Sequence, residues 1–289
     1  MTPALVAAVE EVLGARVERS QAVSGGDINE AFLAKLSDGR QVFIKHHASA
    51  PKRMFESEAR GLRYLAAANA LRVPEVLAVS GEAGGSPAFL VLEYLTPGRR
   101  RQGFDEELGR GLAALHRFGS GSFGLDHDNF IGSLPQSNGP VDSWAEFYRI
   151  RRLEPLWRRA VDNGLVDARL SRSFDALLVK LDELCGPAEP PARLHGDLWG
   201  GNLHSDERGA PVLIDPAVYG GHREVDLAMM RLFGGFGPRV FDAYAEAYAL
   251  SPGHEERVLL YQLYPLMVHL NLFGRSYLSG VQRALGRYV

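Results

Sequence analysis

One nine-residue segment constrains the fold of this chain more than any other, the sequence LHGDLWGGN at residues 194–202. It places a carboxylate, Asp197, and an amide, Asn202, five residues apart on one glycine-rich loop. An aspartate can accept a proton from an attacking hydroxyl group, and an asparagine oxygen can bind a hard cation. A cation site needs a second carboxylate, so the loop predicts that a later segment returns beside it.

Asp215 supplies this second carboxylate. It ends the short apolar stretch VLID, thirteen residues after Asn202. The turn-forming segment Asp206–Gly209 lies between two short strand-like stretches, which is typical of a hairpin. A hairpin would return the strand end to the loop, so we expect Asp197, Asn202 and Asp215 to face one point.

A carboxylate, an amide and a cation together suggest phosphoryl transfer, which also needs a phosphate cradle and a lysine. Ser24, Gly25 and Gly26 open the turn-rich loop SGGDINE, and glycines let backbone N–H groups approach phosphate oxygens. Lys45 follows in the second strand of the next hairpin and would pair with the phosphates. Glu58, on a helix farther along, would hold Lys45 in place.

The first third of the chain is rich in strand signals. Asp-Gly between two apolar or alternating runs is a strong hairpin signal, and apolar residues at helical spacing follow it. Besides a short amphipathic helix at the N-terminus, the expected elements are a hairpin of Ala31–Leu36 and Gln41–Lys45, a helix over Arg53–Ala70, and strands at Val76–Ser80 and Phe89–Glu93. We therefore expect an antiparallel sheet with one main helix laid on it.

Helical signals dominate the rest of the chain. The expected helices are Phe104–Arg117, Trp144–Asn163 with Pro155 interrupting it, Ala168–Leu184, Arg239–Ala249 and Glu255–Tyr277. The chain is thus predicted to be an α+β protein of two lobes, a small strand-rich lobe at residues 1–95 and a larger helical lobe at residues 96–289. Glu93, Tyr94 and Leu95 end the small lobe, where an adenine could hydrogen-bond to exposed backbone.

The order of these parts resembles the protein-kinase-like fold. It is similar to the aminoglycoside and choline phosphotransferase branch, whose catalytic loop reads H-G-D-x-x-x-x-N. The likeness is closer to the fructosamine (ketosamine) kinases, and it covers essentially the whole chain. The segments that carry it are HGDLWGGN, IDPA with Tyr219, GGHREVDLAM at 220–229, FGGF at 233–236, FGLDHDNFIGSLPQ at 123–136 and YQLYPLMVHLNLFGRSY at 261–277.

The resemblance implies specific roles for the residues already named. Asp197 would be the catalytic base, Asn202 and Asp215 would bind Mg²⁺, and Lys45 with Glu58 would form the nucleotide ion pair. The reaction implied is transfer of the γ-phosphate of ATP to the 3-hydroxyl of a fructosamine or ribulosamine. The phosphorylated adduct of such kinases is unstable and releases the amine, which would make the role deglycation repair.

Four further residues take expectations from the loop or from the resemblance. Trp199 inside the loop either packs in the core or forms a wall against the sugar, and His269 either is a structural histidine or contacts the substrate. His195 is expected to organise the loop through hydrogen bonds. Asp226 resembles the aspartate that braces this loop through backbone N–H groups.

Two departures from the protein kinases bear on regulation. The loop reads His-Gly-Asp, so no arginine is present to dock a phosphorylated activation loop, and Asp215 is followed by Pro216 and Ala217 rather than Phe-Gly. We expect no regulation by phosphorylation of such a loop.

Charge and composition exclude several classes of partner. Lys and Arg total 32 and Asp and Glu total 35, a net charge of −3, which provides no basic field for nucleic acid or for a membrane surface. The single cysteine, Cys185, excludes an internal disulfide and fits a reducing cytoplasm. The N-terminus does not read as a signal peptide, and we expect a cytoplasmic monomer acting on a small-molecule or protein-attached ketosamine.

Two alternatives remain open from the sequence. The chain could be a kinase for another hydroxyl compound such as an aminoglycoside or choline. It could also be a non-catalytic nucleotide-binding module, although the complete set Lys45, Glu58, Asp197, Asn202 and Asp215 argues against this.

Overall fold

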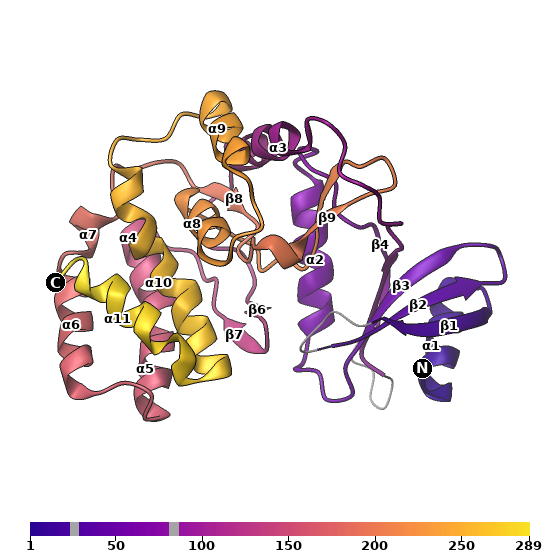
Figure 1. The fold of residues 1–289 in the computed structure, drawn as a ribbon. Helices are drawn as coiled ribbons and strands as arrows, with labels where there is room; N and C mark the ends of the chain where they lie inside the picture. The colour runs from indigo at the N-terminus through magenta and orange to yellow at the C-terminus, as the bar shows by residue number, and fades with distance from the viewer. Residues whose placement is uncertain (24–28, 81–86) are drawn as a thin grey trace.

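The computed structural model describes residues 1–23, 29–80 and 87–289. A twisted sheet lies at one end of the molecule and most of the helices lie at the other, with α2 (Met54–Ala66) between them (Figure 1). The predicted α+β class, a small antiparallel sheet with a larger helical part, is confirmed. The division near residue 95 stays a prediction.

The sheet has five antiparallel strands in the order β1-β2-β3-β5-β4. Their bounds are β1 Val17–Val23, β2 Glu30–Leu36, β3 Gln41–His46, β4 Val76–Val79 and β5 Phe89–Glu93. The predicted hairpin is β2–β3, whose turn uses the left-handed conformation of Gly39. The edge strand β1 was not predicted, because its mostly exposed residues, VERSQAV, lack the apolar alternation that marks a half-buried strand.

Each face of the sheet is covered by one helix. Leu5 and Val9 of α1 (Pro3–Leu13) pack in a core that includes Val91, whereas Leu62 of α2 packs with Leu90, the adjacent residue of the same strand. Because successive strand residues point to opposite faces, β5 is buried on both sides. Burying each large apolar side chain contributes about 1.5–3 kcal/mol. The sheet therefore carries two helices rather than the single one expected.

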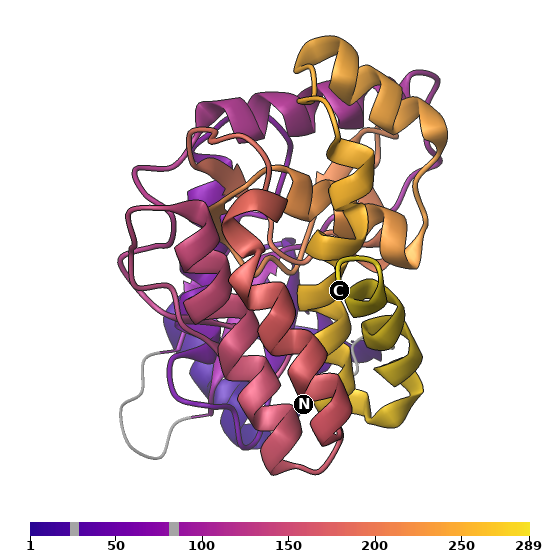
Figure 2. The same cartoon turned by 90° about the vertical axis from the view of Figure 1, so that its left-hand side faces the viewer.

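The helical part follows the sheet in the chain and runs from residue 104 to residue 286. Figure 2 looks onto it, with residues 144–184 in pink facing the viewer and the yellow C-terminal helices beside them. Its helices are α3 Phe104–Phe118, α4 Trp144–Phe147, α5 Glu154–Asp162, α6 Ala168–Val179, α7 Leu181–Leu184, α8 Glu224–Phe233, α9 Pro238–Ala247, α10 His254–Phe273 and α11 Leu278–Gly286. The predicted helices are found, although the expected helix at residues 168–184 divides at Lys180 into α6 and α7. The two helices not expected are α8 and α11.

The expected interruption at Pro155 takes the form of a widened turn. Residues Tyr148–Leu153 form a π-helical segment between α4 and α5, and Pro155 lies in the first turn of α5. Proline has no N–H group and its ring collides with the carbonyl four residues earlier, here that of Arg151. A π-helical turn moves that carbonyl aside without ending the helical run.

Short paired strands frame the loop singled out by the sequence. The predicted hairpin is formed by β9 (Leu203–Ser205) and β10 (Pro211–Leu213). Two further pairs were not predicted, because strands of three residues carry too little pattern: β6 (Asn129–Ile131) with β7 (Leu134–Gln136), and β8 (Ala192–Leu194) with β11 (Tyr219–Gly221). Within the described ranges, no helix is long and apolar enough to cross a bilayer.

A buried histidine makes stability depend on pH. His222 is 2% exposed, its ring stacks on Tyr261, and its Nε2 lies 3.9 Å from a carboxylate oxygen of Glu189. Burial lowers the pKa of His222, although Glu224 and Glu189 oppose this and Arg257 and Arg223 assist it. The folded state therefore binds this proton less readily than the unfolded chain does.

We expect the resulting stability to be complete above pH 6.5 and to be lost as the pH falls below that value. The loss between pH 7.5 and pH 5.5 is at most about 1.4 kcal/mol for one histidine. Urea unfolding of the wild type and of His222→Phe at both pH values measures it. Equal pH dependence of the free energy of unfolding in the two proteins would contradict the assignment.

Candidate active site

The loop after β8 is held in shape by a histidine and by a glycine. Gly196 has φ +83°, and a side chain there would run into the carbonyl of Ala217. His195 is fully buried, its Nε2 donates to the carbonyl of Ile214 at 2.9 Å, and its Nδ1 accepts from the backbone N–H of Asp197 at 3.2 Å. Burial lowers the pKa of His195, so the ring is neutral, with its proton on Nε2. The expected hydrogen-bonding role of His195 is confirmed.

Asp226 on α8 braces the same loop through its backbone N–H groups. Its two carboxylate oxygens accept the backbone N–H groups of His195 at 2.8 Å and Gly196 at 2.9 Å, and His116 of α3 contacts one of them at 3.1 Å. Burial alone would raise the pKa of Asp226, but the hydrogen bond from His116 and the backbone N–H bonds hold it below its usual value. The expected brace is confirmed.

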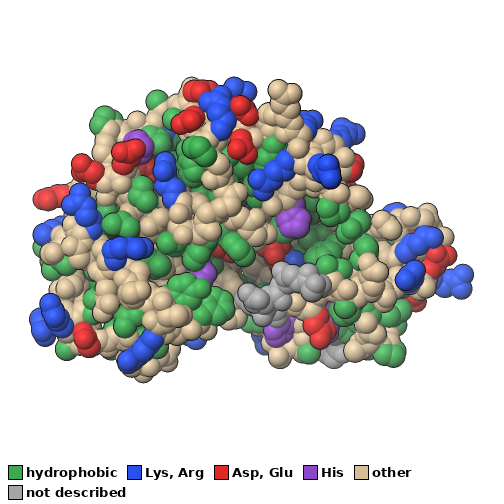
Figure 3. All heavy atoms as spheres, viewed as in Figure 1, with side chains coloured by type: hydrophobic (Ala, Val, Ile, Leu, Met, Phe, Trp, Pro, Cys, Tyr) green, Lys and Arg blue, Asp and Glu red, His purple; other side chains and the backbone are tan. Residues whose placement is uncertain are grey.

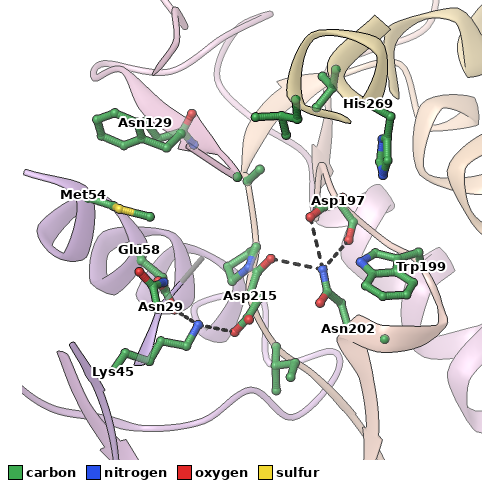
Figure 4. Close-up of a pocket in the computed structure, with 18 of the residues that line it drawn as sticks. Asn29, Lys45, Met54, Glu58, Asn129, Asp197, Trp199, Asn202, Asp215 and His269 are labelled. Carbon is green, nitrogen blue, oxygen red and sulfur yellow. Dashed lines mark hydrogen bonds and ion pairs between the residues drawn. The ribbon is translucent and has the colours of Figure 1, made fainter. Parts of the chain in front are cut away.

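Asp197, Asn202 and Asp215 meet at one point, as their spacing predicts (Figure 4). The side-chain nitrogen of Asn202 lies 2.8 Å from the carbonyl oxygen and 3.3 Å from a carboxylate oxygen of Asp197, and 3.4 Å from the carbonyl oxygen of Asp215. Asp215 has φ +53°, a left-handed backbone that is uncommon outside glycine. Such a conformation persists only where the surroundings impose it, and it is often found at functional sites.

The negative charge of Asp215 acts on Asp197. Burial raises the pKa of Asp197, and the negative charge of Asp215 raises it further, to about 7, although the hydrogen bond from Asn202 works in the opposite direction. A carboxylate with a pKa near neutrality is suited to accept and release a proton. It is also a group to which a cation would be strongly attracted.

Lys45 of β3 brings positive charge to this point from the sheet. Its Nζ lies 2.7 Å from a carboxylate oxygen of Glu58 on α2 and 2.5 Å from one of Asp215. Burial alone would lower the pKa of Lys45, but the charges of Asp215 and Glu58 hold it above its ordinary value. The lysine is therefore charged, and it links the sheet to the end of β10.

These residues line one pocket of about 810 Å³. Figure 3 shows the hollow on the face of the molecule seen in Figure 1. Its acidic lining residues are Glu58, Asp197 and Asp215. In the described part of the chain, no cluster of three or more His, Cys, Asp or Glu side chains could hold a metal ion alone. A cation here would need carboxylate oxygen from Asp215, amide oxygen from Asn202, and oxygens of a bound phosphate, a donor set that suits Mg²⁺.

One wall of the pocket is aromatic. Trp199 is 41% exposed and lies beside Asp197 and His269 in Figure 4. The His269 ring is centred 4.5 Å from that of Phe233 and 4.9 Å from that of Tyr277, and its Nδ1 donates to the carbonyl of Pro265 at 2.8 Å. Both residues expected at the substrate side thus line the pocket.

The rest of this wall was not predicted from the sequence. Phe233, Phe273 and Tyr277 also line the pocket, and they belong to the ends of α8 and α10 and to the turn after α10. Their only signal in the sequence is their place inside the segments FGGF and LNLFGRSY.

Not every expected residue reaches the site. Ser24, Gly25 and Gly26 lie outside the described residues. Glu93, Tyr94 and Leu95 are not among the described residues that line the pocket. The side chain of Glu93 instead accepts a 3.4 Å hydrogen bond from Arg72. An adenine contact at this segment therefore stays a prediction.

Comparison with known proteins identifies the family. The family model described as fructosamine kinase matches residues 1–289. The chain belongs to the fructosamine kinase family.

Two curated relatives carry kinase names. A probable ketoamine kinase of Synechocystis is 40% identical over 275 residues, which cover 93% of this chain and 90% of that protein. A chloroplastic protein-ribulosamine 3-kinase of rice, Oryza sativa subsp. japonica, is 37% identical over 276 residues, covering 92% of this chain and 78% of that protein. This member of the fructosamine kinase family is accordingly an ATP-dependent phosphotransferase that acts on a hydroxyl group.

Solved structures give the same result for the fold. A protein of Thermobifida fusca described as a fructosamine-3-kinase superposes with a TM-score of 0.90 at 36% identity, covering 100% of this chain and 99% of that one. An aminoglycoside phosphotransferase superposes with a TM-score of 0.61 at 17% identity, covering 98% of this chain and 96% of that one. The second likeness concerns the fold alone and confirms that it is protein-kinase-like.

The aromatic wall can be probed through Gly201. A side chain at Gly201 would collide with the ring of Trp199, so we expect Gly201→Ala to displace that ring while the fold is retained. Trp199 is the exposed tryptophan, whereas Trp144 and Trp157 are 7% and 6% exposed. Acrylamide quenching of tryptophan fluorescence measures the change.

The control for this experiment is Gly121→Ala, because a side chain at Gly121 would meet open space. We expect quenching to change in Gly201→Ala and to match the wild type in Gly121→Ala. The packing of Trp199 over Gly201 would be refuted by identical quenching in all three proteins.

Proposed function

We propose that this protein transfers the γ-phosphate of ATP to the 3-hydroxyl of ketosamines, the fructosamine or ribulosamine adducts of amines. The proposal rests on one observation, the meeting of Lys45, Glu58, Asp197, Asn202 and Asp215 in a single pocket. The names of the relatives, ketoamine kinase and protein-ribulosamine 3-kinase, support this acceptor class.

Each residue of the pocket then has a task. Lys45, oriented by Glu58, neutralises negative charge on the nucleotide phosphates. Asp197 accepts the proton of the attacking hydroxyl, a task suited to its pKa of about 7. His195 and Asp226 touch neither reactant and keep Asp197 in position through the loop backbone.

Asn202 and Asp215 are the residues that would hold Mg²⁺. When bound, the ion would supply charge neutralisation for the phosphates. Lys45 forms an ion pair with the side chain of Asp215, and so adds positive charge at the same point. Most of the rate gain is expected from positioning and from this charge neutralisation.

The acceptor side of the pocket favours a ketosamine over an aminoglycoside. Trp199, Phe233 and His269 offer apolar ring faces that can cover a sugar ring, and none of the acidic lining residues belongs to this wall. An aminoglycoside carries several positive charges and would call for acidic partners there. The ammonium group of a ketosamine, a single charge, can lie against aromatic faces.

A phosphate at the 3-position is a better leaving group than a hydroxyl beside the ketone carbon. Elimination of this phosphate, with loss of a proton from C1, would leave an imine, and hydrolysis of the imine by water would give a dicarbonyl sugar and the free amine. The role that follows from this acceptor is therefore deglycation. An assay with free and protein-attached acceptors distinguishes the two forms of the adduct.

We expect Asp197→Asn to lower kcat by a factor of about 10²–10⁴, because the amide cannot accept the proton. The Kd for Mg²⁺-ATP should stay within about threefold, since the nucleotide contacts lie on Lys45 and Asp215. Steady-state kinetics and calorimetric ATP titration measure the two quantities. A variant with wild-type kcat would remove Asp197 from the role of base.

An ATP-consumption assay with four acceptors tests the substrate class. We expect turnover with fructosyl-lysine and ribulosyl-lysine, free and on a glycated protein, and turnover at least a hundredfold slower with kanamycin and choline. Asp197→Asn serves as the blank. Faster turnover of kanamycin or choline would overturn the acceptor proposed, and ATP binding without any phosphorylated product would favour a non-catalytic module.

A further inference from the structure

A buried amide on the hairpin β6–β7 faces the pocket with an unused donor. Asn129 lines the pocket although its residue surface is only 4% exposed (Figure 4). Its Oδ1 accepts hydrogen bonds from Gln136 at 2.7 Å and from Asn138 at 2.8 Å. Its Nδ2 donates one hydrogen to the carbonyl of Val218 at 2.9 Å. Within residues 1–23, 29–80 and 87–289, the second hydrogen on Nδ2 has no acceptor.

Arg152 determines which end of this amide is the donor. An arginine can only donate hydrogen bonds, and its guanidinium lies 2.6 Å from the Oδ1 of Asn138. The side-chain nitrogen of Asn138 must therefore point away from Arg152, toward the carbonyl of His127 and the Oδ1 of Asn129. Because the side-chain nitrogen of Asn138 is a donor, Asn129 has to present its Oδ1 to that nitrogen.

The hydrogen bonds of Gln136 impose the same orientation on the amide of Asn129. The carbonyl oxygen of Ala217 can only accept, so the side-chain nitrogen of Gln136 faces it at 3.1 Å. That nitrogen also donates to the Oδ1 of Asn129, while the oxygen of Gln136 accepts from Tyr264. A flipped Asn129 would set its NH₂ group against two donors and leave the carbonyl of Val218 without one. The orientation of the amide is thus determined from both ends.

Arg152 itself lies in unusual surroundings for a charged side chain. It is fully buried, and no carboxylate in the described part of the chain forms an ion pair with it. It instead stacks 3.9 Å over the ring of Tyr219 and donates to the carbonyl of Ser137 at 2.7 Å. Burying an unpaired charge is costly, so its contribution to a polarised amide network is a specific reason for its presence.

We propose that the second N–H of Asn129 donates a hydrogen bond to an oxygen of the acceptor sugar, with Arg152 as the positioning residue behind it. In the view of Figure 4, Asn129 and His269 both lie above Asp215 and Lys45 lies below it, which favours the acceptor over the nucleotide phosphates as the partner. This inference rests on the proposed function, because it names a further contact of the same acceptor.

The test compares Michaelis constants for the two substrates. Replacing Asn129 by Ala removes one donor, and we expect the KM for fructosyl-lysine to rise about tenfold, the effect of one hydrogen bond. The KM for ATP should stay within about twofold. Asn129→Ser, which keeps a small polar group, is the second variant, and thermal unfolding shows that each protein is folded.

Leu134→Ala is the matched control. Leu134 belongs to the same hairpin, is 3% exposed, and lies outside both the pocket lining and the amide network. It should lower the melting temperature and leave the KM for fructosyl-lysine within about twofold. A purely structural role for Asn129 would give both Asn129 variants this same pattern, and that result would overturn the inference. A rise in the KM for ATP alone would also overturn it, by moving the contact to the nucleotide.

Acceptor analogues that each lack one sugar oxygen provide the decisive measurement. For the wild type, the analogue without the contacted oxygen should have a KM about tenfold higher than the parent compound. For Asn129→Ala, the same analogue and the parent should have equal KM values, and Arg152→Met should reduce the difference. Equal losses in wild type and Asn129→Ala for every analogue would refute the contact.

Activity of the wild type separates the contact from the proposed function. A wild type that phosphorylates no ketosamine refutes the function. An active wild type whose acceptor KM is unaffected by the Asn129 substitutions refutes only the contact.

Discussion

The close approach of two carboxylates, Glu58 and Asp215, to Lys45 is the interaction on which the site depends. The negative charge of Asp215 helps to raise the pKa of Asp197, and Lys45 forms ion pairs with Asp215 and with Glu58. These residues come from β3, α2, the loop after β8 and the end of β10. The charge balance is therefore complete only when the sheet, its helix and the short strands of the helical part are all in place.

Several buried groups hold that arrangement in place. His195 and Asp226 use their hydrogen bonds on the loop backbone, and Asp215 adopts a left-handed conformation that a flexible segment would leave. Catalysis by positioning requires this, because a displacement of about 1 Å can cost a hundredfold in rate. The proposed phosphoryl transfer thus depends also on His195 and Asp226, side chains to which the proposal assigns no contact with a reactant.

Local patterns in the sequence predict the parts of this site that lie on one short stretch. The spacing of Asp197 and Asn202 and the hairpin before Asp215 can be inferred because a turn and two strands have well-defined geometry. The strand β1 and the ladders of three residues could not be inferred, since they are stabilised by tertiary pairing and lack a periodic signal. The aromatic wall could not be predicted for a different reason. In the sequence, Phe233 and Phe273 look like ordinary helix residues, and only the packing of their helices brings them to the pocket.

The orientation of a side-chain amide is the property that sequence conveys least. A string such as DNFIGSLPQSN shows that several amides lie near one another, but each amide has a donor end and an acceptor end, and only its neighbours decide which faces the pocket. Arg152 and the carbonyl of Ala217 are unambiguous groups, one a donor and the other an acceptor, and between them they orient Asn138, Gln136 and Asn129. Arg152 is a buried cation that forms no ion pair with a carboxylate of the described residues, which a stability argument alone would disfavour, and its effect on the orientation of these amides accounts for its position under the proposed acceptor contact.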